Sequence, residues 1–331
     1  MMTKALFSII SPAGTRARLS VLIFHRVLSQ PDDLFPGEAN ARWFDEMLSW
    51  IRNWFNVLPL DEAIFRLKTS TLPMRAAAIT FDDGYSDNYF VALPLLRKHN
   101  LTGTFFVATG FLDGGRMWND TVIESVRRCK YAKLDIGHVR TAANCQLDSF
   151  PVTSNAEKRI AIKTILDQIK YLSVTDRESV MLAIQEKCGS VLPNDLMMTS
   201  KQVIDLRRSG MLIGAHTVTH PILANLPASE VRKEISDSKQ FLESLLQEKI
   251  SLFAYPNGKP NLDYQTKDAS IIKELGFEAA LTTAWGVADS GSDLMQLPRF
   301  TPWDRTKLRF GARLIKNILQ NSRLKHSQTA N

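Results

Sequence analysis

Cysteine is scarce in this sequence. The 331 residues include only Cys129, Cys145 and Cys188, and no two of them have the Cys-x-x-Cys spacing. An odd number of scattered cysteines excludes a disulfide framework, and the missing pairs exclude a zinc site built from thiolates. A metal site in this chain would therefore need histidine and carboxylate ligands.

Long apolar runs are also missing. The run from Ala5 to Ile10 is followed by Ser-Pro-Ala-Gly and then by Arg16 and Arg18, and it is short for the core of a signal peptide. No stretch approaches the roughly 20 apolar residues that span a bilayer. We therefore expect no cleaved signal and a soluble, cytoplasmic protein. Association with a membrane surface stays open as an alternative.

The excess of basic residues is small. Lys and Arg number 41 and Asp and Glu 34, which gives a net charge of +7. Such an excess suits an acidic glycan, a lipid-linked phosphate or an anionic membrane equally well. No nucleic-acid-binding module is recognisable, so we expect no nucleic-acid partner. Hydrophobic residues make up 44% and charged residues 23%, which is typical of a globular chain.

Short apolar runs alternate with amphipathic segments along much of the chain, which indicates a parallel α/β sheet or barrel. The runs that indicate strands are 20–25, 57–58, 76–82, 102–108, 211–215, 252–255 and 277–282. The segments that indicate helices are 41–55, 61–68, 87–98, 200–209, 228–247, 267–275 and 305–320. The chain length is ordinary for one barrel with an insertion.

The alternation is interrupted between residues 113 and 200. Residues 155–171 and 175–188 indicate helices with sparse apolar stripes, and all three cysteines lie in this stretch. We interpret 113–200 as a helical insertion over one end of the barrel. A separate domain is disfavoured, because the apolar content is thin for a core of its own.

Extensions flank the barrel on both sides. Residues 1–19 form an N-terminal extension, 20–303 form the barrel with its insertion, and 304–331 form a basic helix and tail. In that last helix, basic residues lie beside apolar ones. It either contacts an anionic membrane or presents a solvated outer face while packing on the barrel.

Two adjacent acids end one of the strand-like runs. The small apolar residues 76–79 lead into Asp82, Asp83 and Gly84. Such a run is typical of a buried parallel strand, and α/β barrel enzymes place their chemistry at the carboxyl ends of strands. A turn at Gly84 can direct both acids into one pocket. The alternative is an acidic turn that simply closes the strand.

Two of the six histidines lie four residues apart after another apolar run, 211–213. His216 and His220 can share one metal ion, but Pro221 disfavours a helix at His220, so we expect a loop there. A chance pair is the alternative. Two histidines and one carboxylate leave a coordination position open, which is the composition of a catalytic zinc site.

The sequence Thr-Phe-Asp-Asp-Gly at 80–84 and the sequence His-Thr-Val-Thr-His at 216–220 resemble two motifs of a known family. They are similar to the first and second motifs of the polysaccharide deacetylases, the NodB-like carbohydrate esterases. The motifs occur in the family's order, and the resemblance covers about residues 20–300. It implies an α/β fold, a distorted TIM-like (β/α)7 barrel, here with a helical insertion.

The resemblance also implies roles for the motif residues. Asp83, His216 and His220 correspond to the family's metal ligands, and Asp82 corresponds to its catalytic base. Zn²⁺ is the expected cofactor, although other divalent ions also suit this ligand set. A backbone N–H at Asn257 is expected to help hold the oxyanion, as part of substrate binding.

The late histidine of most family members is missing. No histidine occurs between His220 and His326, which lies in a polar tail. His25, within Ile-Phe-His-Arg-Val, resembles the early strand-end histidine of the branch that acts on biofilm polysaccharides. We expect it to protonate the amine leaving group. The alternative is a strand-end histidine paired with a neighbour.

The third motif also departs from the family. Its usual Arg-x-Pro-Tyr is replaced here by Ala-Tyr-Pro-Asn at 254–257, so the arginine that orients the base is absent. Arg299 is the expected substitute, with surface placement as the alternative. Among the aromatic residues, Tyr85, Trp118, Trp285 and Trp303 either stack on sugar rings or pack within the protein.

The function implied by the resemblance is metal-dependent removal of N-acetyl groups from amino sugars. The substrate would be a polysaccharide or its lipid-linked precursor. One alternative is another amidohydrolase or esterase with the same site, such as a deformylase acting on a glycan. The other is a glycan-binding relative without activity, and the complete set of base and metal ligands disfavours it.

Overall fold

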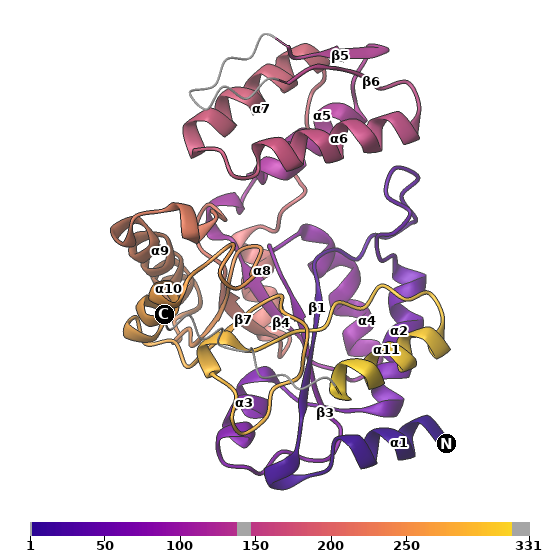
Figure 1. Cartoon of the computed structure of the whole chain (residues 1–331), viewed down its shortest axis with the longest axis vertical. Coiled ribbons are helices and arrows are strands. Elements are labelled where there is room, and N and C mark those ends of the chain that lie inside the picture. The colour runs from indigo at the N-terminus through magenta and orange to yellow at the C-terminus, as the bar shows by residue number, and fades with distance from the viewer. Residues whose placement is uncertain (1, 138–146, 320–331) are drawn as a thin grey trace, which may run out of the picture.

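The fold is built on a curled parallel sheet (Figure 1). The computed structural model describes residues 2–137 and 147–319. Within them, the seven-stranded sheet has the order β1-β3-β4-β7-β8-β9, and β2 pairs with β3. All of these pairs are parallel. The strands are β1 (Leu19–Phe24), β2 (Asn56–Val57), β3 (Ala76–Phe81), β4 (Thr104–Val107), β7 (Leu212–Ala215), β8 (Leu252–Ala254) and β9 (Ala279–Leu281).

A late segment lies between the two ends of this sheet. Leu297 forms a parallel bridge with Leu281 of β9, and Phe300 forms one with Leu22 of β1. These contacts link the last strand to the first through residues 297–300 and so bring the curled sheet toward a closed barrel. The distorted α/β barrel predicted from the sequence is confirmed.

Helices pack around the outside of the sheet. They are α2 (Ala41–Trp54), α3 (Leu60–Lys68), α4 (Leu93–Lys98), α8 (Ser200–Arg208), α9 (Ala228–Leu246) and α10 (Thr266–Glu274), with α1 (Met2–Ile10) and α11 (Lys307–Leu319) from the two ends of the described chain. Short 3₁₀ or π turns occur at Gly14–Arg16, Asn88–Ala92, Thr109–Phe111, Leu223–Asn225 and Leu294–Gln296. Among the described residues, no helix has the length and apolar character needed to cross a bilayer.

The alternation of side chains along β3 explains its alanine-rich sequence. Ala77, Ile79 and Phe81 pack into the large hydrophobic cluster that also holds residues of α2. Ala76 and Ala78 belong to a second cluster, together with large side chains such as Phe106. Successive strand residues point to opposite faces, so small residues on one face leave room for these large neighbours.

The interrupted stretch forms a layer of its own above the barrel (Figure 1). It contains α5 (Trp118–Arg127), the antiparallel pair β5 (Lys133–Asp135) and β6 (Ser149–Pro151), α6 (Asn155–Ile169) and α7 (Val174–Cys188). Its buried apolar residues form a separate hydrophobic cluster, to which the barrel loop adds Leu34. The sequence interpretation that this stretch is too thin in apolar residues for a core of its own is therefore wrong, because residues of α5, α6 and α7 together form that core. Cys145, His326 and the end of the basic tail lie outside the described residues.

Candidate metal and catalytic site

The two acids lie directly after β3 and are both buried, with exposed fractions of 2% for Asp82 and 6% for Asp83. Asp83 has φ +77° and Gly84 has φ +92°. The left-handed region is unfavourable for a residue with a Cβ, and such strain is typical of functional sites. The backbone is fixed on both sides, because Asp82 N donates to Phe24 O and Ala108 N donates to Asp83 O. The turn predicted at Gly84 thus begins one residue earlier.

The histidine pair lies on a loop after β7, as the sequence predicted. His220 has φ +53°, and its backbone N donates to Thr217 Oγ1. Glu234 of α9 holds the loop, because its carboxylate accepts from the backbone N of Val218 and of Thr219, both at 2.9 Å. No sequence pattern marked Glu234, which lies on α9, the helix that follows this loop.

The three expected ligands converge on one point. His216 Nε2 and His220 Nε2 each lie 3.4 Å from Asp83 Oδ1, and one ligand atom from each residue lies within 4.8 Å of the others. Ligand atoms around a tetrahedral Zn²⁺, at about 2.0–2.1 Å from the ion, are themselves about 3.3 Å apart. The spacing therefore fits a single divalent ion.

The electrostatics of this group also favour a cation. His216 Nδ1 donates to Ala254 O at 2.7 Å, which leaves Nε2 directed at the carboxylate of Asp83. Burial lowers the pKa of His216, but Asp83 and Asp82 raise it more, so the net shift is upward. Burial lowers the pKa of His220 to about 3, which keeps it neutral and able to ligate. Burial raises the pKa of Asp83, but the hydrogen bond of His216 and the charge of His220 shift it below its usual range.

Arg299 fixes Asp82 through a two-pronged ion pair. Its Nη1 and Nη2 each lie 2.7 Å from one carboxylate oxygen, and its Nε donates to Thr282 O at 2.8 Å. Arg299 is 0% exposed, so the surface alternative is wrong. Burial raises the pKa of Asp82, but the charge and hydrogen bonds of Arg299 lower it overall. Asp82 is therefore ionised at neutral pH and keeps a free lone pair on each oxygen.

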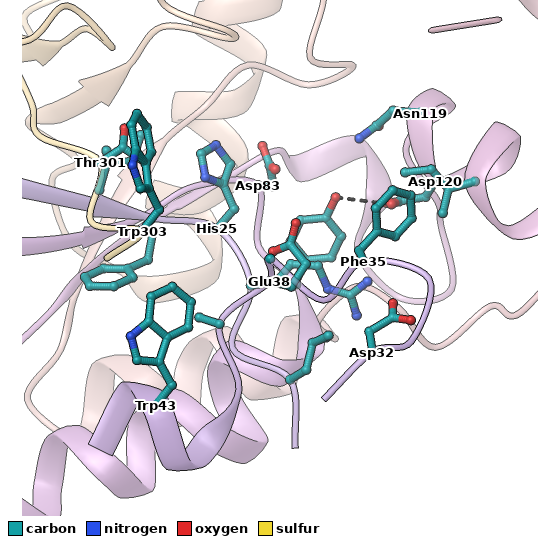
Figure 2. A pocket seen from close by; sticks show the side chains of 18 of the residues that line it. His25, Asp32, Phe35, Glu38, Trp43, Asp83, Asn119, Asp120, Thr301 and Trp303 are labelled. Carbon is teal, nitrogen blue, oxygen red and sulfur yellow. Dashed lines mark hydrogen bonds between the residues drawn. The ribbon is translucent and has the colours of Figure 1, made fainter. Parts of the chain in front are cut away.

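A cavity of about 370 Å³ opens beside these residues (Figure 2). Its lining includes His25, Asp83 and Tyr85 from the barrel and Asn119 and Asp120 from α5 of the insertion. His25 follows β1 and is exposed, and its carbonyl accepts from Asn88 Nδ2 at 2.8 Å. The structure thus brings the expected acid, His25, to the same cavity as the metal group.

Asp120 is the member of this cavity that the sequence analysis missed. It is 3% exposed, its Oδ1 accepts from Tyr85 Oη at 3.3 Å, and its Oδ2 is buried without a partner. Burial raises its pKa to about 7, and the charge of Asp83 adds to this shift. Arg26 stacks on the ring of Tyr85, with its guanidinium carbon 4.7 Å from the ring centroid. No sequence motif marks Asp120, because its partner comes from a different part of the chain.

Two residues expected at the substrate do not line this cavity. The ring of Trp118 lies 4.8 Å from the guanidinium carbon of Arg177 and packs against the cluster of the insertion. This contact fits the packing alternative for Trp118, and its contact with a sugar stays a prediction. Asn257 adopts φ +57°, and its carbonyl accepts from Thr283 Oγ1 at 2.7 Å. Its part in substrate binding stays a prediction.

Comparisons with known proteins identify the family. The sequence pattern described as "Polysaccharide deacetylase" matches residues 69–138 and 144–280, so the chain belongs to the polysaccharide deacetylase family. YxkH of Bacillus subtilis (strain 168), which carries the family's name, is 21% identical over 287 residues. That match covers 86% of this chain and 71% of YxkH.

Solved structures of similar fold come from several bacteria. The Streptococcus pyogenes deacetylase PplD, in complex with acetate, has a TM-score of 0.59 and 20% identity, with 91% of this chain and 98% of PplD covered. IcaB from Ammonifex degensii has a TM-score of 0.57 and 20% identity, with 93% and 98% covered. A de-N-acetylase from Aggregatibacter actinomycetemcomitans has a TM-score of 0.56 and 17% identity, with 91% and 100% covered. At these identities the likeness shows the fold.

Proposed function

We propose that this protein is a metal-dependent deacetylase that hydrolyses the N-acetyl group of amino sugars in a glycan. The observation that carries the proposal is the group of Asp83, His216 and His220, in which two imidazole nitrogens lie at 3.4 Å from one carboxylate oxygen. Membership of the polysaccharide deacetylase family supports a glycan substrate. The acetate in the PplD structure supports acetate as the product.

Asp83, His216 and His220 would hold the ion, with Zn²⁺ as the first candidate. A divalent ion bound there supplies a Lewis acid and lowers the pKa of a bound water toward about 7. Asp82 accepts the proton of the attacking water, since its carboxylate is ionised and free of the metal group. Arg299 holds that carboxylate in one orientation through its paired hydrogen bonds.

The amine leaving group needs a proton, and we assign this donation to His25. It is exposed at the end of β1 and lines the cavity together with Asp83. An imidazole is a suitable general acid near neutral pH. The replacement of a late histidine by an early one is possible because β1 and β3 are paired neighbours, so their carboxyl ends meet.

Two other residues that line the cavity would recognise the sugar. Asp120, across the cavity from His25, offers a buried oxygen without a partner, and Trp303, beside His25, offers an aromatic ring (Figure 2). A buried polar atom without a partner costs about 1–3 kcal/mol, which a hydroxyl of a bound sugar would recover. Replacing Asp120 by Ala should therefore raise KM more than it lowers kcat.

Acetate release from a panel of N-acetylated glycans tests this function. The intact protein should release acetate, lose this activity with a chelator, and regain it with added Zn²⁺. Asp82→Asn should abolish turnover and still bind the ion, because Asp82 is not a ligand. Formate release without acetate would assign a deformylase instead. Glycan binding without any product, with the metal bound, would assign a non-catalytic relative.

A further inference from the structure

The positive charge of this chain is concentrated at its two ends. Residues 1–31 and 305–331 contain eleven of the 41 Lys and Arg residues and none of the 34 Asp and Glu residues. The remaining residues carry 30 basic and 34 acidic side chains, so the body between the ends has a slight negative excess. The net charge of +7 therefore comes from basic ends on a slightly acidic body rather than from a uniformly basic surface.

The fold brings the described parts of these two ends together. Helices α1 and α11 contact each other, and Figure 1 shows both on the same side of the barrel. Arg18, which follows α1, donates to Ile318 O of α11. The inner faces are docked through Phe7 of α1 and Phe310 and Leu314 of α11, all of which are 0% exposed in the large cluster. The outer faces therefore form one surface on a rigid support.

Apolar and basic side chains alternate on this outer surface. Ile9 is 75% exposed and Leu308 is 86% exposed, and Leu6 and Leu319 are also exposed. Lys4, Arg16, Lys307, Arg309 and Lys316, from α1, the turn that follows it and α11, are exposed as well. Among the described residues, none of these five cations forms an ion pair within 4.0 Å. We call these nine side chains the α1–α11 surface.

We propose that the α1–α11 surface binds an anionic lipid bilayer. Unpaired Lys and Arg interleaved with Leu and Ile, with no acid, are the composition of helices that lie in a membrane interface. A nucleic acid would satisfy the cations but would leave the exposed Leu and Ile side chains in water. An anionic bilayer satisfies both, because its headgroups attract the cations while its acyl boundary accepts the apolar side chains.

The proposed surface continues to the rim of the catalytic cavity. Trp303, which lines the cavity, is 52% exposed, and its ring centroid lies 4.0 Å from the guanidinium carbon of Arg313 on α11. Trp285 lies 5.3 Å from Trp303, also partly exposed. Tryptophan is enriched at the membrane interface, where one side of the ring is apolar and the other wet. Bilayer binding would therefore hold the cavity beside glycans at the membrane surface, a consequence that rests on the proposed function.

Vesicle flotation with the full chain tests the binding itself. The protein should float with vesicles of phosphatidylcholine mixed with phosphatidylglycerol, and much less with phosphatidylcholine alone. Added salt should weaken the binding, because the Debye length shrinks from about 10 Å at 0.1 M to about 3 Å at 1 M. Equal binding to both kinds of vesicle, or no binding to either, would overturn the proposal.

Variants locate the binding on the molecule. Arg309→Gln with Lys316→Gln should weaken binding to the mixed vesicles about 30-fold, at about 1 kcal/mol for each basic residue. Ile9→Ser with Leu308→Ser should weaken it through the apolar contribution. The matched control is Lys187→Gln with Lys273→Gln, exposed residues on α7 and α10, which should bind like the natural chain.

Two further readouts separate the possible failures. Acetate release from a soluble oligosaccharide should be unchanged in all three variants, which shows that they are folded. If the two control substitutions weaken flotation as much as Arg309→Gln with Lys316→Gln, the binding follows net charge and the proposal is wrong. Tighter binding to random duplex DNA than to the mixed vesicles would assign the surface to nucleic acid. Flotation without any deacetylase activity would refute the proposed function and leave this inference standing.

Discussion

The buried pair of Arg299 and Asp82 gives the most quantitative prediction. Arg299→Met removes both hydrogen bonds to Asp82 and leaves a carboxylate that is 2% exposed without its charge partner. Removal of one partner from a buried ion pair typically costs about 3–5 kcal/mol. We expect a loss of that size in the free energy of unfolding. Urea denaturation at neutral pH, with a chelator present, measures it without a contribution from bound metal.

The size of this loss should depend on pH in one direction. Burial raises the pKa of Asp82, but the charge and hydrogen bonds of Arg299 keep it below its usual value of 3.8. A lowered carboxyl pKa contributes stability that is present above the unfolded pKa and is lost as pH falls through the folded pKa. The difference between the natural chain and Arg299→Met should therefore be largest near neutral pH. It should shrink as the pH falls below about 4.

A double-mutant cycle shows whether the loss comes from this pair. In Asp82→Asn, Arg299 no longer has a buried carboxylate to neutralise. Adding Arg299→Met to this variant should therefore lower the free energy of unfolding less than Arg299→Met does in the natural chain. We expect a coupling energy of about 2–3 kcal/mol, as for residues in one buried network. Additive effects, within about 0.5 kcal/mol, would refute the reasoning. Arg299→Lys keeps the charge without the paired hydrogen bonds, so its stability should lie between those of the natural chain and Arg299→Met.

Three more outcomes follow from particular contacts. Between about pH 4 and 7 the natural chain should lose on the order of 4 kcal/mol of stability that Asp120→Asn keeps, because the raised pKa of Asp120 makes its ionisation in the folded state costly. A difference between the two chains in urea denaturation that does not depend on pH would contradict this. Gly214→Ala should destabilise the fold by about 1–3 kcal/mol, because its Cβ would lie 2.4 Å from the ring of Phe106, whereas Gly37→Ala, with open space around it, should be neutral in the same thermal unfolding assay. Added Zn²⁺ at 100 times its dissociation constant should stabilise the natural chain by about 2.7 kcal/mol and should leave His216→Ala unchanged in thermal unfolding.

Local patterns and the resemblance to the family's motifs together pointed to the central residues. The acids of β3 and the histidines after β7 each follow a short apolar run, and the structure places each of these runs in the parallel sheet. Parallel strands end at one edge of a sheet, so residues far apart in sequence meet there. Arg299 lies 217 residues from Asp82, and its place in a late strand-like segment suggested it as a candidate without excluding a surface position.

The insertion was less predictable for a physical reason. Its core is assembled from short stripes, such as Ile162, Ile165 and Ile169 on α6 and Val180, Ile184 and Cys188 on α7. Each stripe is narrow and lies among many charged residues, so it gave a weak signal by itself. Asp120 was missed for a different reason, because its partner Tyr85 lies 35 residues earlier and on the barrel. Trp118 was chosen as an aromatic residue, but residue type alone does not distinguish a packed ring from a sugar platform.

The central claim is that Asp83, His216 and His220 together hold one divalent ion next to Asp82. A crystal structure of the zinc-loaded protein, with anomalous scattering recorded at the zinc absorption edge, tests it most directly. We predict one anomalous peak about 2.0–2.1 Å from an Nε2 atom of each histidine and from an oxygen of Asp83. No peak within bonding distance of all three side chains, under conditions where the enzyme is saturated with zinc, would contradict the account.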